Sequence, residues 1–218
     1  PSDYTPSFSQ SEINNAGAGT DWVDFVLRDG NLTNHNLSVS GGADKITYHF
    51  SGNFFDQNGT VENSGMQRYN ARASLTFKFN DVVSLNASIT GNKNFYNNTV
   101  AGWQTGGAGA NAFTALQAAF AYPAYLPVKQ DDGSFTQYQL VGNPVSQLQI
   151  RDETEYNSLL ARFSVDVTII PEKLTGKILY GNNYEASERD FFIPSTVNWF
   201  DEYASRGSLQ QDDRMYQT

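Results

Sequence analysis

The sequence predicts an all-β fold, and specifically a transmembrane, antiparallel, up-and-down β-barrel. Three observations lead to this prediction. Apolar and polar residues alternate strictly in several separate segments, the connections between these segments are by turns tight and long, and the chain is rich in aromatic residues (14%) and glycine (18 residues). Alternation with a period of two indicates a strand with one apolar and one polar face. Short turns at one end and long loops at the other are typical of outer-membrane barrels.

Five tracts carry the alternation, and two flanking segments complete the predicted sheet. The alternating tracts cover residues 46–54, 68–79, 83–90, 158–169 and 174–185. Only Leu160 interrupts the fourth tract. Residues 36–42 and 207–218 are predicted to add one strand on each side, which gives seven strands in all.

The connections fall into two classes. Tight turns are predicted at 43–45, 80–82 and 171–173, whereas longer links cover about 57–66, 96–153 and 189–206. Because successive strands run up and down, all tight turns lie at one end of the sheet and all long links at the other. The link 96–153 is predicted to be a long extracellular loop with structure of its own, since loops of this length are usually functional or disordered.

That loop is predicted to contain a short helix and a hairpin. Asn111 is a candidate N-cap for a helix that passes through Phe113, Leu116 and Phe120 to Tyr122, and Pro123 would stop it. Asp131-Asp132-Gly133 indicates a hairpin turn between Val128 and Phe135.

The apolar face of the strands has two possible destinations. In a soluble barrel of the lipocalin kind it would point inward around a ligand. Three features favour an outward, lipid-facing arrangement: the alternating faces are long enough for a tilted strand to cross a bilayer, the polar faces mix Asn, Ser, Thr and Arg, and aromatic residues collect toward strand ends. Those aromatics are Phe54, Phe77, Phe79, Tyr180 and Tyr184.

Composition and motifs argue against several other functions. The net charge is -9 and no basic cluster offers a footprint for nucleic acid. Cysteine is absent, which leaves no disulfide and no thiolate metal site. His35 and His49 are the only histidines, no serine lies in a nucleophile-elbow sequence, and Asp131-Asp132 is better explained by its turn than by paired catalytic carboxylates. We expect no enzyme activity, no metal and no cofactor.

The chain contains no run of about 18 apolar residues and does not begin with a signal peptide. The second observation also fits a chain that begins inside a longer, exported protein. Two alternatives stay open at this point. A small stand-alone outer-membrane barrel would serve as an adhesin or structural protein, and a soluble ligand-binding β domain would need no detergent.

A set of short motifs is shared with a known family. They are Thr20-Asp21-Trp22, Asn34-His35-Asn36-Leu37-Ser38-Val39-Ser40-Gly41-Gly42, Tyr48, Phe55-Asp56-Gln57-Asn58-Gly59 and Arg68-Tyr69-Asn70-Ala71-Arg72. These motifs resemble the start of the barrel in SusC-like TonB-dependent transporters, the outer-membrane nutrient importers of Bacteroidetes-type bacteria. Asp132-Gly133-Ser134 and Asn143-Pro144-Val145 resemble the long early loop of that family.

The resemblance implies a 22-stranded barrel with an N-terminal plug, energised by TonB and covered outside by a SusD-like lipoprotein that binds glycan or peptide. Seven strands are fewer than the eight of the smallest bacterial barrels. We therefore expect a fragment, in which residues 1–30 form a plug-to-barrel linker and residues 31–218 form the N-terminal part of the barrel. TonB contact would belong to the missing N-terminal part, and lipids of the outer membrane would surround the sheet.

Candidate site residues follow from the two faces and the long loop. Arg68, Arg72, Arg162 and His49 are expected to face the lumen and the plug, because buried charges need partners. Aromatic residues of the loop are candidates for stacking on substrate or for seating the lid lipoprotein. An equally good interpretation is that they only pack the loop on itself. These residues are Trp103, Tyr122, Tyr125 and Tyr138.

Overall fold

The computed structural model describes residues 8–15, 17–98, 114–139 and 141–197, together with the backbone of 208–217. The chain divides into two compact units. The sheet unit comprises residues 29–98, 151–192 and 209–218, and the loop unit comprises residues 1–28, 99–150 and 193–208. We describe each unit by itself.

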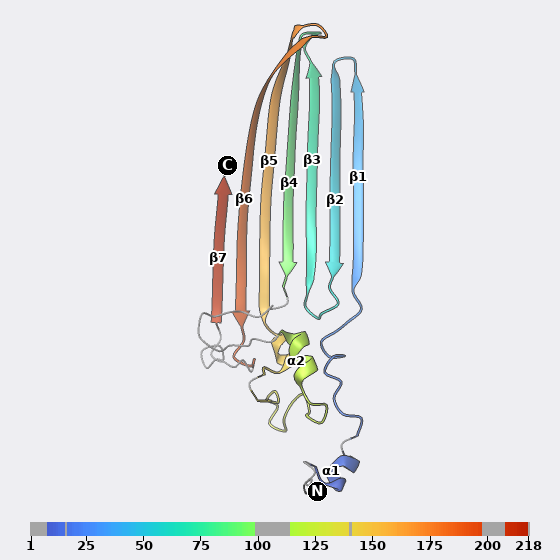
Figure 1. Cartoon of the computed structure of the whole chain (residues 1–218), viewed down its shortest axis with the longest axis vertical. Coiled ribbons are helices and arrows are strands. Elements are labelled where there is room, and N and C mark those ends of the chain that lie inside the picture. The colour runs from blue at the N-terminus through green and yellow to red at the C-terminus, as the bar shows by residue number, and fades with distance from the viewer. Residues whose placement is uncertain (1–7, 16, 99–113, 140, 198–207, 218) are drawn as a thin grey trace, which may run out of the picture. The chain divides into compact units, whose positions relative to one another are not determined.

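The sheet unit is one antiparallel sheet of seven strands whose spatial order equals their order in the sequence (Figure 1). This confirms the predicted up-and-down topology. The strands are β1 (Asn31–Ala43), β2 (Ile46–Asn58), β3 (Gly65–Lys78), β4 (Val83–Asn97), β5 (Arg151–Ile170), β6 (Leu174–Ile193) and β7 (Ser208–Gln217).

Tight turns join the strands at one end of the sheet, as predicted. Ala43 pairs with Ile46 across the first turn, and Phe79 donates to the carbonyl of Val83 across the second. The third turn places Glu172 at a φ of 60°. At the opposite end, β4 and β5 are joined through a long part of the loop unit. β1 also begins at this end, because Asn31 pairs with Asn58.

Strands β5 and β6 extend farther than their alternating tracts predict. β5 begins at Arg151, although the alternating tract begins only at Ser158, and β6 continues to Ile193. The two strands stay in register there, from Arg151 opposite Phe192 onward. Glu153 and Glu155 remove the apolar alternation but not the backbone pairing, so a sequence pattern based on hydrophobicity misses this part.

The loop unit contains three short helices: α1 (Gln10–Asn15), α2 (Ala115–Ala121) and α3 (Pro144–Gln147). Helix α2 corresponds to the predicted loop helix, but its N-cap is Thr114 and not Asn111. The Thr114 hydroxyl accepts from the amide of Gln117, whose side chain accepts in turn from the amide of Thr114, which forms a capping box. Asn111 and Phe113 lie outside the described residues.

The predicted hairpin of the loop unit is confirmed. Lys129 pairs with Phe135, and Gly133 at the turn has a φ of 83°, which glycine adopts without strain. The Asp132 carboxylate accepts from both the amide and the hydroxyl of Ser134, at 2.9 and 2.6 Å. These hydrogen bonds lower the pKa of Asp132 and show why an Asp stands at this position.

The residues before β1 pack on the long loop rather than standing apart. Trp22 donates from Nε1 to the carbonyl of Pro123 at 3.0 Å, and Thr20 bonds through its amide and hydroxyl to the carbonyls of Ala124 and Leu126. The loop unit therefore includes most of the segment predicted as a linker, residues 1–30. Its role as a link to a plug stays a prediction.

Candidate functional site

One face of the sheet unit is polar from β1 to β6. The backbone register arranges its residues in rows that cross the strands. His49 and Arg162 lie in one such row, connected through Ser74 and Ser88. Arg72 lies in the adjacent row, and Arg68 lies two rows farther toward the long-connection end. The structure thus brings the four predicted lumen residues onto a single face, while their contact with a plug stays a prediction.

A line of amides crosses this face, which we call the amide row. Its members are Asn36, Asn53, Asn70, Asn92, Ser158 and Glu185, each opposite the next in the register. Asn70 donates to the Asn92 side-chain oxygen, and Asn92 donates to the hydroxyl of Ser158 at 3.0 Å. Such side-chain ladders leave carbonyl and hydroxyl groups with unused capacity toward whatever lies over the face.

A second polar chain crosses the same face nearer the tight turns. Thr76 donates to Asn86 at 2.8 Å, and Asn86 donates to Asp166 at 2.6 Å. Lys177 lies 3.2 Å from the other carboxylate oxygen of Asp166. The charges of Asp166 and Lys177 are therefore carried within a hydrogen-bonded chain, as expected for a surface that meets water or a polar partner.

The opposite face of the same strands is apolar and exposed. Leu37 and Ile178 keep 79% and 75% of their surface accessible. Such exposure of apolar side chains is unfavourable in water but not in a lipid environment. The apolar stretch of β2 from Ile46 to Phe54 extends roughly 27 Å at about 3.4 Å per residue, comparable with the band of an outer-membrane barrel. Aromatic pairs mark both limits of this face. Phe77 and Phe79 lie 4.7 Å apart at the turn end, and Phe54 and Tyr69 lie 5.0 Å apart toward the other end.

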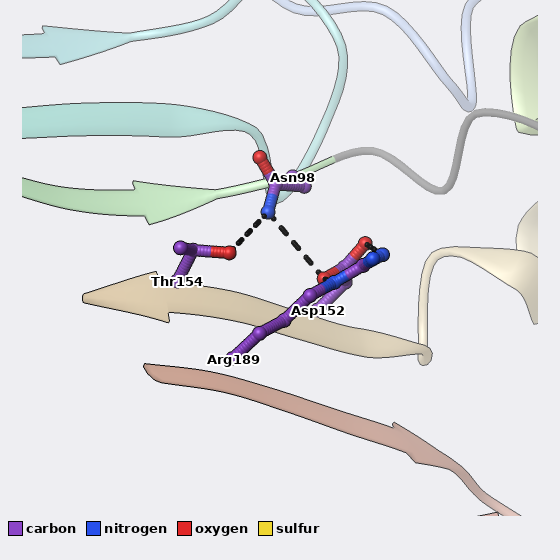
Figure 2. A network of polar contacts seen from close by, with 4 residues as sticks. All are labelled: Asn98, Asp152, Thr154 and Arg189. Atoms are coloured by element: carbon purple, nitrogen blue, oxygen red, sulfur yellow. Dashed lines mark hydrogen bonds and ion pairs between the residues drawn. The ribbon is translucent and has the colours of Figure 1, made fainter. Parts of the chain in front are cut away.

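A buried ionic network lies where the long loop leaves and re-enters the sheet (Figure 2). Arg189 of β6 binds both carboxylate oxygens of Asp152, the second residue of β5, and Asp152 is only 4% exposed. Asn98, directly after β4, donates its amide to the Asp152 carbonyl at 2.8 Å and its side chain to Thr154 at 3.1 Å. The network fastens the first residue of the long loop to the strand that follows it.

The loop aromatics are divided between core and surface. Tyr122 is buried, its ring lies 4.8 Å from Trp22 in an edge-on contact, and its hydroxyl donates to the carbonyl of Val141 at 2.9 Å. Burial raises the pKa of Tyr122 to about 12. Tyr125 is 52% exposed, and Tyr138 is half-buried with its ring 5.7 Å from Tyr122. Trp103 lies outside the described residues.

Asn143 is the polar centre of the loop unit. The sequence analysis did not name it as a candidate site residue. It is fully buried, caps α3 by accepting from the amides of Val145 and Ser146, and donates to the carbonyls of Thr136 and Val128. The sequence Asn143-Pro144 carried a signal that points to it, since Asn at an N-cap followed by Pro is a common helix start.

The amide row was also missed, although the sequence holds a trace of it. Asn36, Asn53 and Asn70 are spaced at equal intervals along the chain. Equally spaced residues lie in one row across a sheet only when the strand and turn lengths place them opposite one another. The register between strands has to be known to see this. Within the described residues, no group of three or more His, Asp or Glu side chains is arranged to hold a metal ion. Among the same residues, no helix is long and apolar enough to span a membrane.

Sequence comparison finds relatives among TonB-dependent receptors, while no family model matches the chain. The chain is 26% identical to TonB-dependent receptor P3 of Formosa agariphila over 198 residues, which are 89% of this chain and 19% of that protein. It is 34% identical to TonB-dependent receptor SusC of Bacteroides thetaiotaomicron over 85 residues, which are 38% of this chain and 8% of SusC. The chain thus spans less than a fifth of these relatives.

Solved structures share the fold. The RagAB peptide importer in its closed-closed state matches 92% of this chain and 22% of its own, with a TM-score of 0.67 and 18% identity. A second structure of the RagAB peptide transporter gives 0.66. The same antiparallel strands therefore occur in a solved transporter barrel. These relatives and this fold together support the identification of the chain as a fragment of a SusC-like TonB-dependent transporter, whose sheet is part of a β-barrel of the outer membrane.

Proposed function

We propose that this sheet forms part of the wall of an importer that takes up glycans or peptides and works with a SusD-like surface lipoprotein. The carrying observation is the pair of faces on β1 to β6. A polar face with amides, hydroxyls and spaced cations, interrupted by Leu160 and Leu179, lies behind an apolar face that exposes Leu37 and Ile178. A wall with lipid on one side and a wet or plugged lumen on the other needs this division.

The cations of the polar face support a role in holding a partner inside the barrel. Among the described residues, Arg72 and Arg162 form no ion pair within the chain, while Arg68 lies 5.1 Å from the ring of Phe55. Guanidinium groups inside a barrel are stable only with water or with acceptors such as carboxylates. Acidic residues of a plug would supply these acceptors, and His49 lies in the same row as Arg162.

The amide row supports the class of substrate. Amide and hydroxyl groups pair equally well with sugar hydroxyls and with peptide backbone, and both are neutral polar polymers. The exposed Tyr125 and the half-buried Tyr138 of the loop unit offer faces on which a sugar ring or an apolar side chain of a peptide packs. The same exposed aromatics suit contact with the lid lipoprotein.

Uptake by intact cells tests the proposal. We would delete the gene for the full protein in its source bacterium, restore it in trans, and measure depletion of glycan and peptide mixtures from the medium. The proposal expects one of the two classes to be depleted only in the restored strain, and only when TonB is present. A double variant Asn70→Trp, Asn92→Trp should reduce uptake by obstructing the polar face, while Ala87→Leu on the apolar face serves as control.

Two outcomes would contradict the proposal. One is uptake of both mixtures at equal rates with and without the gene. The other is uptake that is independent of TonB. Affinity purification of the protein from detergent-solubilised membranes adds an independent readout, because a co-purifying surface lipoprotein is expected at near-equal amounts.

A further inference from the structure

The part of the amide row between β3 and β6 is neutral in the middle and has a charged group near each end. Asn70, Asn92 and Ser158 carry no charge and lie opposite one another in the register. On β3, Arg68 lies one row farther toward the long-connection end than Asn70. On β6, Glu185 lies opposite Ser158. A positive and a negative group are thus separated by a strip of neutral hydrogen-bonding groups, which we call the dipolar strip.

Arg68 is oriented by an aromatic ring and keeps its hydrogen-bond donors free. Its guanidinium lies over the ring of Phe55, directly opposite on β2, at 5.1 Å from the ring centroid. Arg68 is exposed, and no carboxylate of the described residues forms an ion pair with it. Stacking uses the flat face of a guanidinium, so the N–H groups at its edge stay available for a carboxylate. Arg68 therefore offers a pre-oriented site for a carboxylate.

Glu185 has neutral hydrogen-bond partners but no cation beside it. Asn183 donates to its carboxylate at 2.8 Å, and the hydroxyl of Tyr156 is hydrogen-bonded to the same carboxylate. Among the residues that the structure describes, no Lys, Arg or His forms an ion pair with Glu185. A carboxylate has about four acceptor positions, so two contacts leave room for more. A half-buried carboxylate of this kind is suited to a positively charged donor.

We propose that the dipolar strip binds a short peptide by its two free termini, with the C-terminal carboxylate at Arg68 and the N-terminal ammonium at Glu185. The peptide backbone lies over the neutral amides and hydroxyl between them. A peptide carries this pair of opposite charges whatever its side chains are, whereas a neutral oligosaccharide carries neither. The inference rests on the importer function proposed above and selects peptide over glycan as its substrate. Arg72 and Arg162 lie nearer the tight turns and remain available to a plug.

The separation of the two charged residues sets the length of the peptide. Arg68 and Glu185 are three strands and one row apart in the register. This is roughly 16 Å along the sheet, at about 4.8 Å per strand and about 6.8 Å per row. An extended chain covers about 3.3–3.6 Å per residue, so about five residues reach from one charge to the other.

The strip also lies where a substrate from outside arrives early. Asn70 is closer to Gly65, at the long-connection end of β3, than to Lys78 at the other end. The long connections of outer-membrane barrels are on the outer side. A peptide that enters from that side meets the dipolar strip before it reaches the half of the wall near the tight turns.

Retention of peptide pools by the full-length protein, purified from outer membranes in mild detergent, tests the proposal. The probes are a pool of random pentapeptides with free termini, the same pool acetylated at the N-terminus, and the same pool amidated at the C-terminus. Mass spectrometry after gel filtration measures the retained peptides. We expect the wild type to retain the free pool better than either blocked pool by about tenfold or more, the factor that one lost hydrogen bond between charged groups gives.

Two single variants match each charge to its terminus. Arg68→Gln should lose the preference for a free C-terminus and keep the preference for a free N-terminus, and Glu185→Gln should do the reverse. Each variant reports its own folding through the preference that it keeps. If one of them fails to fold, the wild type and the other variant still decide. Lys78→Gln is the matched control, on the same strand and face as Arg68 but at the tight-turn end, and should keep both preferences.

Three results would overturn the proposal. Equal retention of the three pools by the wild type would mean that peptide termini are not recognised. Preferences that persist in both Arg68→Gln and Glu185→Gln would place the recognition elsewhere. Retention of no pool at all would refute peptide binding by the strip. In that case, TonB-dependent depletion of glycans in the uptake experiment would leave the importer function standing, whereas uptake without TonB would refute that function separately.

Discussion

Arg189 donates hydrogen bonds to both carboxylate oxygens of Asp152, from Nε at 2.7 Å and from Nη2 at 2.6 Å. The Asp152 side chain is 2% exposed and that of Arg189 is 42% exposed, so the cation reaches inward from the surface to a buried anion. The backbone of the same Asp152 holds Asn98 at the start of the long loop. One ion pair thus joins β6 to the base of the loop (Figure 2).

Removal of Arg189 is predicted to destabilise the base of the loop. Arg189→Ala leaves the Asp152 carboxylate buried without its charged partner, which costs about 3 kcal/mol in comparable cases. Asp152→Asn should cost less, because the amide oxygen still accepts from Asn98 and the exposed Arg189 turns to water. Hydrogen exchange of the amides at 98 and 152–154, followed by mass spectrometry, measures the effect.

The control for this prediction is Lys177→Ala. Lys177 lies on the same strand and face and pairs with Asp166, but it is 58% exposed, and exposed ion pairs contribute about 0–1 kcal/mol. Equal loss of protection in Arg189→Ala and Lys177→Ala would contradict a special role for the buried pair.

Asn143 is predicted to be the most sensitive polar position of the loop unit. Asn143→Asp keeps the shape and the capping oxygen but turns a carboxylate oxygen toward the carbonyls of Thr136 and Val128, where the amide donates now. Asn143→Ala loses these two donated bonds and also the two capping bonds from the amides of Val145 and Ser146, but it buries no charge. We expect the buried carboxylate that faces two carbonyls to cost more than the lost cap.

Protease resistance of residues 114–150 in the full protein would show the order of these variants. We expect Asn143→Asp to be cleaved fastest, then Asn143→Ala, then the wild type. Gln130→Ala, with an exposed side chain in the same unit, should match the wild type. If Asn143→Asp were as resistant to protease as the wild type, then either its carboxylate is protonated or the loop unit does not depend on the hydrogen bonds of Asn143.

Tyr122 is predicted to weaken the loop unit at alkaline pH. Its pKa is raised from 10.0 to about 12 because burial disfavours the phenolate. The folded state therefore favours the neutral phenol. The contribution of the buried, neutral Tyr122 phenol to the stability of the folded state is complete below pH 10 and is lost as the pH rises from 10 to 12.

Tyr122→Phe tests the sign and the position of this step. The difference in tyrosinate absorbance between the wild type and Tyr122→Phe should rise near pH 12, and the unit should lose protease resistance in the same interval only in the wild type. Tyr125→Phe removes an exposed tyrosine of the same unit and should leave the step in place. A difference curve that is complete by pH 10 would contradict the burial of Tyr122.

The sequence predicted the strands better than their partners across the sheet. Period-two alternation identified the segments around Ile46 and Leu75 because one face of each is apolar, and the turn residues fixed the hairpins. The alternation begins only at Ser158 and misses the part of β5 that starts at Arg151, where both faces are polar and pairing with β4 and β6 maintains the strand. The sequence analysis took Asn111 as the N-cap because Asn is a preferred capping residue. Thr114 and Gln117 form a Thr-x-x-Gln motif that could have indicated the capping box seen in the structure.

The sites divide in the same way. Alternation alone placed Arg68, Arg72, Arg162 and His49 on one face, because a residue's face depends only on its position within its own strand. The pair of Asp152 and Arg189 and the amide row need the register between strands, and the burial of Tyr122 needs the contact with Trp22 from a distant segment. None of these relations is local in the sequence.

Neighbouring residues of β3 are predicted to differ in access to water. Ser74 belongs to the polar row of His49 and Arg162, whereas Ala73 pairs with Phe50 and Ile89 on the apolar face at nearly the same depth. The chain has no cysteine, so single cysteines report cleanly once the remainder of the protein is also free of them. In intact outer membranes, Ser74→Cys should react with a water-soluble maleimide. Ala73→Cys should stay unreactive toward this reagent, because the reagent remains in water and thiolate formation also needs water.

Asp81→Cys in the exposed turn between β3 and β4 controls for reagent entry and should react from the side of the tight turns. If Ala73→Cys reacts with the water-soluble reagent faster than Ser74→Cys, the apolar face points inward and the wall is inverted. If both are silent while Asp81→Cys reacts, the polar face is covered. Deletion of the plug should then uncover Ser74→Cys and leave Ala73→Cys unchanged, because only the polar face meets the inside of the barrel.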